Sequence, residues 1–149
     1  MVVACSGRCV DTGAVRSIEF EVQTGRDTRI VDVTGEIADF VGSLGDGLVS
    51  VFVPHATAGL AIVEIGAGSE SDLISVLDEI LPAKEGRWKH AHGSPGHGRD
   101  HVLPALISPS LTIPVVNGRI ALGVWQSVVL VDTNRDNGQR RVRLSFIPG

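Results

Sequence analysis

The chain of 149 residues contains no tyrosine, and aromatic residues make up only 4% of it. Because few rings are available for bases to stack on, a surface for single-stranded nucleic acid is not expected. Basic residues are also few: 13 lysines and arginines against 17 acidic residues give a net charge of −4. The densest basic stretch is Arg140, Arg141 and Arg143, whose alternation suggests a strand face, so duplex binding through phosphates is not expected either.

Long apolar runs and cysteines are scarce as well. No run approaches the roughly 20 residues of a membrane span, so no membrane partner is expected. The opening residues 1–9 are too short and too polar to be a signal peptide, which favours the cytoplasm. The only cysteines are Cys5 and Cys9. They could close a disulfide or supply half of a metal site, but free thiols in a reducing compartment are the simpler interpretation.

The composition that remains is that of a folded domain. Hydrophobic residues make up 43% of the chain and charged residues 20%, which argues against disorder. Eighteen glycines and seven prolines indicate many turns. A length of 149 residues suits one ordinary domain, and no internal repeat is visible. We therefore expect a single domain over residues 1–149.

The first third of the chain predicts two strands and a helix. Residues 15–23 alternate between polar and apolar side chains, as in a strand with one buried face. Residues 29–33 alternate again, and the intervening turn suggests that the two strands pair as a hairpin. Thr34 is a candidate helix N-cap, and apolar residues follow it at helical spacing as far as Leu44.

The middle of the chain predicts two strands, at 49–53 and 60–64, and a second helix. Ser69 and Asp72 have the spacing of a capping box in which aspartate replaces the usual glutamate. An apolar stripe then continues at helical spacing until Pro82, which ends the helix because proline cannot continue it.

The C-terminal part predicts four short strands: 112–116, 119–122, 125–132 and 139–147. Asn117-Gly118 is a strong signal for a two-residue hairpin turn. Paired strands at both ends with two main helices between them predict an α+β fold of mixed, mainly antiparallel β-sheets, rather than a doubly wound sheet.

Residues 84–104 have little periodicity and contain four of the five histidines. A loop of this length inside a compact domain is uncommon unless it is functional or disordered. Neutral imidazole is the commonest metal ligand, and three histidines with an open fourth position form a catalytic zinc arrangement. The four histidines are His90, His92, His97 and His101. Solvated loop histidines without a metal are the alternative.

The fifth histidine, His55, follows Pro54 at the end of an apolar strand, in a polar turn that also holds Thr57. Pro54 cannot donate to a sheet ladder and so marks the strand end, which makes this a rigid position for chemistry. Thr57 could bind an anion or cap the turn. Glu64 ends the next strand and could act as a general base or orient a histidine, or simply face water.

Arginines near the C-terminus are candidates for binding phosphate. Arg135, Arg140 and Arg141 could clamp a phosphate bidentately. The alternative is that they are exposed charges on a strand and a turn.

Two motifs stand out: the turn His55-x-Thr57-Ala58-Gly59 and the stretch Leu122-Gly123-x-Trp125-Gln126. Around them lie, in order, Glu64, Asp72-Leu73, Leu81-Pro82, Trp88-x-His90, His101-Val102, Ile113-Pro114-Val115 and Asn117-Gly118. Over nearly the whole chain this order resembles the YjbQ-like family of small proteins, often labelled secondary thiamine-phosphate synthases.

The resemblance implies a YjbQ-like α+β domain that assembles as a homotrimer, with a polar pocket near the subunit boundaries. The family's shared polar positions fall on His55, Thr57, Glu64, His90, His101 and Gln126. It implies a divalent metal, zinc as the first choice, held by His55, His90 and His101. We assign catalytic roles to Glu64 and Thr57, and to His97 as a spare ligand or proton carrier. A small phosphate-bearing or anionic molecule would be bound by Gln126, Arg135 and Arg140.

The chain departs from the family pattern in three places. Ala56 stands where a threonine is usual, which removes a hydroxyl near the site. His97 stands where an asparagine is usual, which adds a potential ligand. The usual acidic-Gly-Pro-Arg turn near the C-terminus is replaced by the longer stretch 132–138.

Two classes of function follow from these residues. The first is an enzyme: a weak thiamine-phosphate synthase-type transferase, or an enzyme of metal-dependent phosphate chemistry at the histidine cluster. The second is a non-catalytic trimer that captures a small anion or metabolite. A metal that only pins the histidine loop is a third interpretation.

Overall fold

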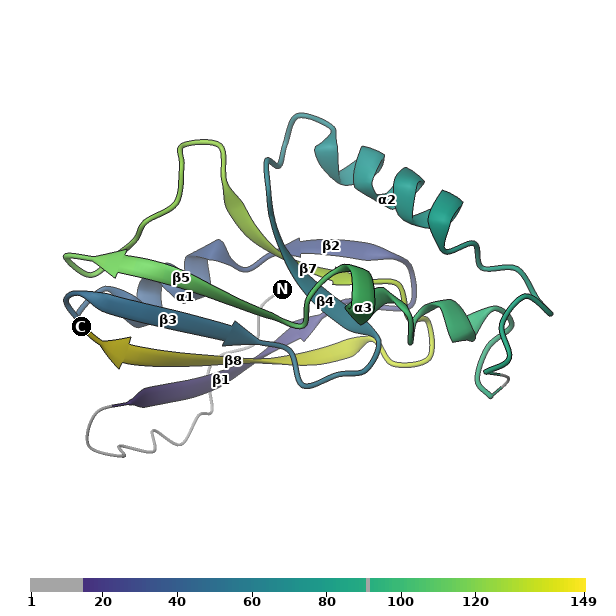
Figure 1. Cartoon of the computed structure of the whole chain (residues 1–149), viewed down its shortest axis with the longest axis horizontal. Helices are drawn as coiled ribbons and strands as arrows, with labels where there is room; N and C mark the ends of the chain where they lie inside the picture. The colour runs from purple at the N-terminus through teal and green to yellow at the C-terminus, as the bar shows by residue number, and fades with distance from the viewer. Residues whose placement is uncertain (1–14, 91) are drawn as a thin grey trace.

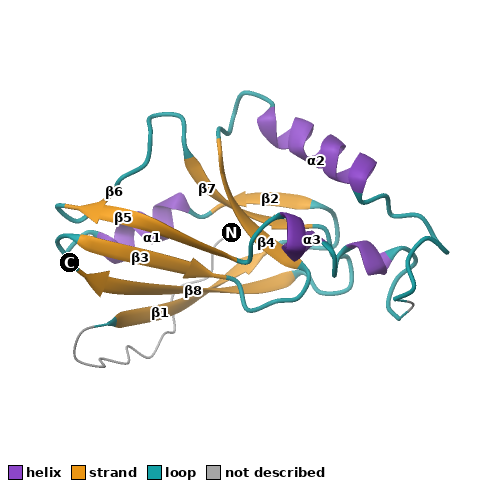
Figure 2. Cartoon of the chain, in the orientation of Figure 1, coloured by secondary structure: helices purple, strands orange, loops and turns teal. Residues whose placement is uncertain are grey.

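The computed structural model describes residues 15–90 and 92–149, and its strands form two antiparallel sheets (Figures 1 and 2). The expectations for Cys5 and Cys9 fall outside the described residues. Among those residues, no helix has the length and apolar character needed to cross a membrane.

The larger sheet has the strand order β1-β8-β3-β5-β6. These strands are β1 (Arg16–Gln23), β8 (Gln139–Pro148), β3 (Gly47–Phe52), β5 (Ser110–Val116) and β6 (Arg119–Ile120). One face is buried: Val49 lies opposite Phe146 and Val51 opposite Leu144, and all four belong to the main core. The predicted turn at Asn117-Gly118 is confirmed, with φ of 49° and 70°.

The smaller sheet has the order β2-β7-β4, from β2 (Arg29–Asp32), β7 (Ser127–Asp132) and β4 (Ala58–Val63). Its central strand, β7, is buried on both faces. Val128 and Leu130 pack in the main core against the larger sheet, whereas Val129 and Val131 pack in a second core. The smaller sheet is therefore the middle layer of three.

The helices are α1 (Thr34–Val41), α2 (Ser69–Ile80), the single 3₁₀ turn η1 (His97–Arg99) and α3 (Leu103–Leu106). Figure 1 shows α2 and α3 on one side of the smaller sheet. There Leu77, Leu81 and Leu103 form the second core with β7. α1 instead buries Ile37 and Val41 in the main core. The predicted α+β fold with mainly antiparallel sheets is confirmed.

The predicted hairpin between 15–23 and 29–33 is wrong. β1 pairs with β8 in the larger sheet, and β2 pairs with β7 in the smaller one. The backbone N–H groups of Thr24 and Gly25 both donate to the carbonyl of Gly138. These bonds fix a turn at which the chain crosses from one sheet to the other, so the two strands cannot pair.

Both predicted helix caps are also wrong. The hydroxyl of Thr34 accepts a hydrogen bond from the backbone N–H of Val128 instead of capping α1. α2 does begin at Ser69, but no side chain caps it, and the residue before it is Gly68 with φ of 101°. The first turn is held instead by Glu70, whose carboxylate accepts a backbone hydrogen bond from the preceding loop.

The predicted strand 125–132 begins later than expected. β7 starts at Ser127 because the preceding residues fold into a turn. The backbone N–H of Gln126 donates to the carbonyl of Gly123, and the Gln126 side chain accepts from the Gly123 N–H. Trp125 therefore lies on an exposed turn, with 73% of its surface open to solvent.

Candidate functional site

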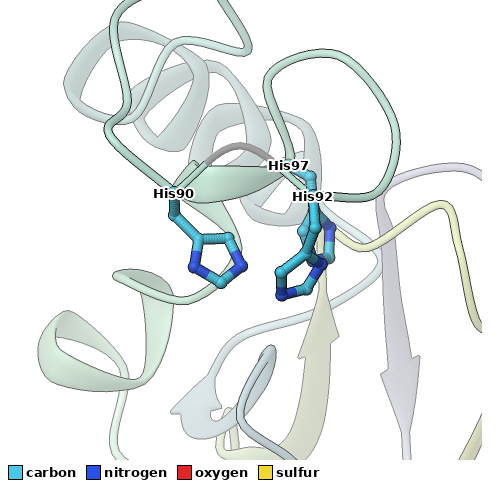
Figure 3. Close-up of side chains that lie close together, drawn as sticks. All are labelled: His90, His92 and His97. Carbon is cyan, nitrogen blue, oxygen red and sulfur yellow. The ribbon is translucent and has the colours of Figure 1, made fainter.

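The loop between α2 and α3 brings four imidazole rings together. The ring centroid of His90 lies 4.0 Å from that of His92 and 4.2 Å from that of His101. The centroids of His97 and His101 are 4.8 Å apart, and their Nε2 atoms 3.0 Å. We call these four side chains the histidine cluster. Figure 3 shows the rings of His90 and His92 turned toward each other, with His97 beside them.

The donor set fits a transition metal. One ring nitrogen from each of His90, His92 and His97 lies within 4.8 Å of the others. Nitrogens around a tetrahedral zinc ion are about 3.4 Å apart, so side-chain movements of about 1 Å would close the site. Imidazole nitrogen suits zinc, copper, iron and nickel better than magnesium or calcium, which prefer oxygen.

The electrostatics of the cluster favour neutral rings. Partial burial lowers the pKa of His101, and the nearby rings of His90, His97 and His92 lower it further. The pKa of His90 is lowered by the same two causes in the same order. Neutral imidazole is the form that has a lone pair for a metal, so both side chains are in a metal-binding state at neutral pH.

His97 is the buried member, and two carboxylates face its Nδ1 atom. Asp100 Oδ2 lies 3.1 Å away in a hydrogen bond, and Asp136 Oδ2 also lies 3.1 Å away. The other oxygen of Asp100 accepts a 2.6 Å hydrogen bond from the hydroxyl of Thr133. Burial raises the pKa of Asp100, whereas the backbone N–H of Ser94 lowers that of Asp136. Carboxylates accept hydrogen bonds, so both aspartates are placed to accept one from Nδ1 of His97, while its Nε2 faces Nε2 of His101.

A cavity of about 330 Å³ adjoins the histidine cluster. Lys84, Trp88, His90 and Ser94 are among the residues that line it. Trp88 is fixed there because its Nε1 donates a 3.0 Å hydrogen bond to the carbonyl of Pro82. Since His90 belongs to both the wall and the cluster, a small molecule in the cavity would lie beside a metal bound by the histidines.

His55, predicted as a metal ligand, is not part of the histidine cluster. Among the described residues it has no ring contact with the other four histidines, and its Nε2 accepts a hydrogen bond from the backbone N–H of Arg141 in β8. Partial burial lowers its pKa, and the charges of Arg140 and Arg141 lower it further. Of the three predicted ligands, the structure thus brings together His90 and His101 but not His55.

Glu64 and Gln126 lie at the far end of the smaller sheet. The ladder between β4 and β7 runs from Ala58 opposite Asp132 to Val63 opposite Ser127, which spans about 17 Å. Glu64 and Gln126 continue from the Val63 end and are both exposed. Figure 1 accordingly shows the loop before β7 well away from the loop after α2.

The opposite end of the smaller sheet, where Ala58 pairs with Asp132, is the end at which Thr57, Arg140 and Arg135 lie. Their environments there differ. Arg140 is 1% exposed and donates through Nη2 to Asp132 and, at 3.4 Å, to Thr57. The alternative of an exposed strand charge is therefore wrong for Arg140. Arg135 is exposed and lines a small pocket with His97.

Comparison with known proteins agrees with the fold. The profile of the family described as "UPF0047 protein YjbQ-like" matches residues 18–149. The chain belongs to this family. A UPF0047 protein of Mycobacterium tuberculosis is 56% identical over 129 residues, which cover 87% of this chain and 98% of the relative. A UPF0047 protein of Archaeoglobus fulgidus is 30% identical over 115 residues, covering 77% and 89%.

Solved structures give the same result. A hypothetical protein of Aeropyrum pernix superposes with a TM-score of 0.80 at 31% identity, covering 89% of this chain and 98% of that one. A YbjQ-like protein of unknown function from Sulfolobus solfataricus superposes with a TM-score of 0.83 at 23% identity, covering 91% and 98%, and supports the fold alone. None of these four names states an activity, so the chemistry of this UPF0047 protein must be argued from its own side chains.

The sequence interpretation missed the two carboxylates that face His97. Asp100 had a usable signal, because residues three apart on a helical turn share one face. Asp136 had none, since it reaches His97 only through the folded path of the β7–β8 loop (residues 133–138). His92, treated in the sequence as one of four loop histidines, belongs with His90 and His97 to a group whose ring nitrogens are close enough to hold a metal ion.

Proposed function

We propose that this UPF0047 protein is an enzyme that holds a divalent transition metal, zinc as the first choice, and acts on a small phosphate-bearing molecule. The observation that carries the proposal is the histidine cluster, in which His97 is buried and anchored by carboxylates. Solvated loop histidines would have no reason to be packed ring against ring, because packing removes water from the rings and disfavours their protonated form.

In this proposal His90, His92 and His97 are the ligands, and His101 is a fourth ligand or a proton carrier. A bound metal would supply a Lewis acid that neutralises charge on a phosphate group. Side chains of the protein supply the other roles, which are to orient the ligands and to bind the substrate. Asp100 keeps His97 oriented, and Lys84, a cation in the wall of the adjoining cavity, binds the substrate's anionic group.

We also propose a cytoplasmic homotrimer in which a neighbouring subunit completes the site. Glu64 and Gln126 are too far from the histidine cluster of their own chain to act there. Next to Gln126, Val124 and Trp125 are 93% and 73% exposed, which is typical of a protein contact rather than of a surface in water. A contact through this turn would carry Glu64 and Gln126 toward the site of the next subunit.

The decisive experiment is elemental mass spectrometry on protein purified without a histidine tag. We expect near-stoichiometric zinc or another transition metal in the wild type and in His55→Ala, and loss of the metal in His90→Ala, His97→Ala. Comparing these two variants shows whether the metal is bound by the histidine cluster or by His55, which lies outside it. Metal retained in the double variant would contradict the proposed ligands.

Substrate assays follow from the metal result. Release of phosphate from small monoesters, and the thiamine-phosphate synthase-type reaction, in which pyrophosphate departs, both require neutralised negative charge. Turnover that is lost in His90→Ala, His97→Ala would support the enzyme. Thermal stabilisation by phosphate compounds without turnover would favour the alternative of a non-catalytic anion-binding trimer, to which the Lys84 cavity is also suited.

A further inference from the structure

Two carboxylate groups face the same ring nitrogen of the histidine cluster, Nδ1 of His97. Asp100 Oδ2 and Asp136 Oδ2 are each 3.1 Å from Nδ1 of His97. The Asp100 side chain is 4% exposed and the Asp136 side chain 37%. One carboxylate would be enough to satisfy the single N–H at this atom, so the second needs an explanation.

Asp100 is held in place by its own segment and by the end of β7. It lies three residues after His97, on the turn that continues η1, and its backbone N–H donates to the carbonyl of His97. Its Oδ1 accepts the hydroxyl of Thr133, and the guanidinium of Arg99 lies 3.6 Å from the same oxygen. The carboxylate therefore has little freedom to turn away from His97.

Asp136 is brought from the β7–β8 loop, and the histidine loop is shaped to receive it. The backbone N–H of Ser94 donates to Asp136 Oδ2 at 3.1 Å. Gly93 has φ of 81°, and a Cβ atom there would lie 2.5 Å from Asp136 Oδ2 and 3.0 Å from the His97 ring. Only glycine leaves room for this approach in this backbone conformation.

The β7–β8 loop is itself fixed to the interior. The Asp136 N–H donates to Asn134 Oδ1 at 2.8 Å, and the Asn134 N–H donates to Asp132 Oδ1 at 3.0 Å. The Asn134 side chain also donates to Thr57, at 3.2 Å. A chain of hydrogen bonds thus runs from the buried Asp132–Arg140 pair through the loop to Asp136, which touches the cluster.

We propose that Asp100 and Asp136 are positioning residues that hold His97 as the Nδ1–H tautomer and present Nε2 to the metal. This inference rests on the proposed metal function and adds two roles to it. Asp100 orients the ring from within the histidine loop, and Asp136 ties the ring to the β7–β8 loop. Carboxylates behind a ligating histidine also make the imidazole a stronger donor.

The first test reads the tautomer in metal-free protein. Long-range ¹H–¹⁵N NMR distinguishes an Nδ1–H from an Nε2–H imidazole without any metal. We expect His97 to be the Nδ1–H tautomer in the wild type and to lose this preference in Asp100→Asn, Asp136→Ala. An Nε2–H tautomer in the wild type, or an unchanged tautomer in the double variant, would overturn the proposal.

The second test measures Zn²⁺ affinity by competition with a chelating dye. Loss of an outer carboxylate weakens metal binding by about 10- to 100-fold, and we expect this for Asp136→Ala. Asp78→Ala is the matched control: it also removes a carboxylate, from the ion pair with Arg99, but does not touch His97. Asp136→Glu should restore most of the affinity. Equal affinity in Asp136→Ala and the wild type would count against the role of Asp136.

The two measurements separate this inference from the proposed function. Wild-type protein that binds no Zn²⁺ would overturn the metal function, whereas the tautomer measurement would still decide whether the carboxylates position His97. Tight Zn²⁺ binding that is unchanged in Asp136→Ala, together with an unchanged tautomer in the double variant, would keep the metal function and overturn the positioning role. If the buried Asp100→Asn prevents the double variant from folding, the tautomer of His97 is read in Asp136→Ala, which changes a more exposed side chain. An unchanged tautomer there would overturn the role of Asp136.

Discussion

Arg140 donates a hydrogen bond from Nη2 to Oδ1 of Asp132 across 3.0 Å, and the two side chains are 1% and 0% exposed. Asp132 also accepts a 2.6 Å hydrogen bond from the hydroxyl of Thr24. Arg140 belongs to β8 in the larger sheet and Asp132 to β7 in the smaller one. This buried ion pair therefore joins the two sheets at the end from which the β7–β8 loop leaves.

Removing one partner of this pair should strongly destabilise the protein. We expect Arg140→Met to lower the free energy of unfolding by about 3–5 kcal/mol, because Asp132 is left as an uncompensated buried charge. Urea unfolding of metal-free protein measures the effect. The control is Arg143→Met, which breaks an exposed pair with Glu19 and should cost less than about 1 kcal/mol. Similar losses in both variants would contradict the argument.

His55 should make the stability depend on pH. Its pKa in the folded protein is below the usual 6.5, so the unfolded chain binds its proton more readily. The free energy of unfolding should therefore be highest above about pH 6.5 and fall as the pH drops through that value toward the lower folded pKa. The physical reason is that partial burial, and then the charges of Arg140 and Arg141, oppose a protonated ring at this position. Protonation of Nε2 would also remove the acceptor of the Arg141 backbone N–H.

The variant His55→Gln isolates this contribution, because an amide oxygen can accept the same hydrogen bond without titrating. Urea unfolding of metal-free protein at about pH 7.5 and about pH 5.5 should show a smaller acid loss in the variant than in the wild type. The histidine cluster is present in both proteins, so its own pH dependence cancels in the comparison. Equal losses would show that His55 does not contribute.

The sequence predicted the elements whose cause is local. The alternation in 15–23 and the apolar stripe of α2 follow from periods of 2 and 3.6 residues, and both elements formed as expected. The predicted hairpin failed because strand pairing depends on distant partners. β1 prefers the long β8 strand, which lies more than a hundred residues away in the chain. The partner of a strand therefore cannot be predicted from the pattern of residues within that strand.

The same distinction applies to the site. The high number of histidines in residues 84–104 correctly pointed to the loop that forms the cluster, because all four clustered rings come from this short segment. The grouping of His55 with His90 came from the resemblance alone, and in this chain the two rings are not in contact. The sequence offered Arg140 as a phosphate ligand or, alternatively, an exposed charge, but its partner Asp132 is supplied by the other sheet. Such pairs require the tertiary structure.

Gly59 should be intolerant of even one added methyl group. In the middle sheet it faces Ile107 after α3, and a Cβ at Gly59 would overlap the backbone carbonyl of Ile107. We expect Gly59→Ala to lower the free energy of unfolding by about 1–3 kcal/mol, as overpacking does when backbone must move. Gly35→Ala in α1 is the matched control: nothing lies within 4 Å of its Cβ, so it should be neutral or stabilising. Thermal unfolding that does not distinguish the two would refute this.

Trp125 should control assembly if the proposed trimer forms through its turn. A large aromatic side chain at the centre of a contact can contribute 2 kcal/mol or more, roughly a 30-fold change in affinity per contact. Two hydrogen bonds between Gly123 and Gln126 hold the turn in shape within the single chain. Presenting a preformed surface reduces the entropy that association costs.

We therefore expect light scattering coupled to size exclusion to give three times the chain mass for the wild type and a smaller species for Trp125→Ala at micromolar concentration. Val76→Ala, which shortens an exposed apolar side chain on α2, is the control and should leave the mass unchanged. Because each subunit's histidine cluster is made within one chain, Trp125→Ala should retain its metal while losing turnover that depends on Glu64 and Gln126 of a neighbour. A wild-type monomer with full activity would contradict both the assembly and the shared site.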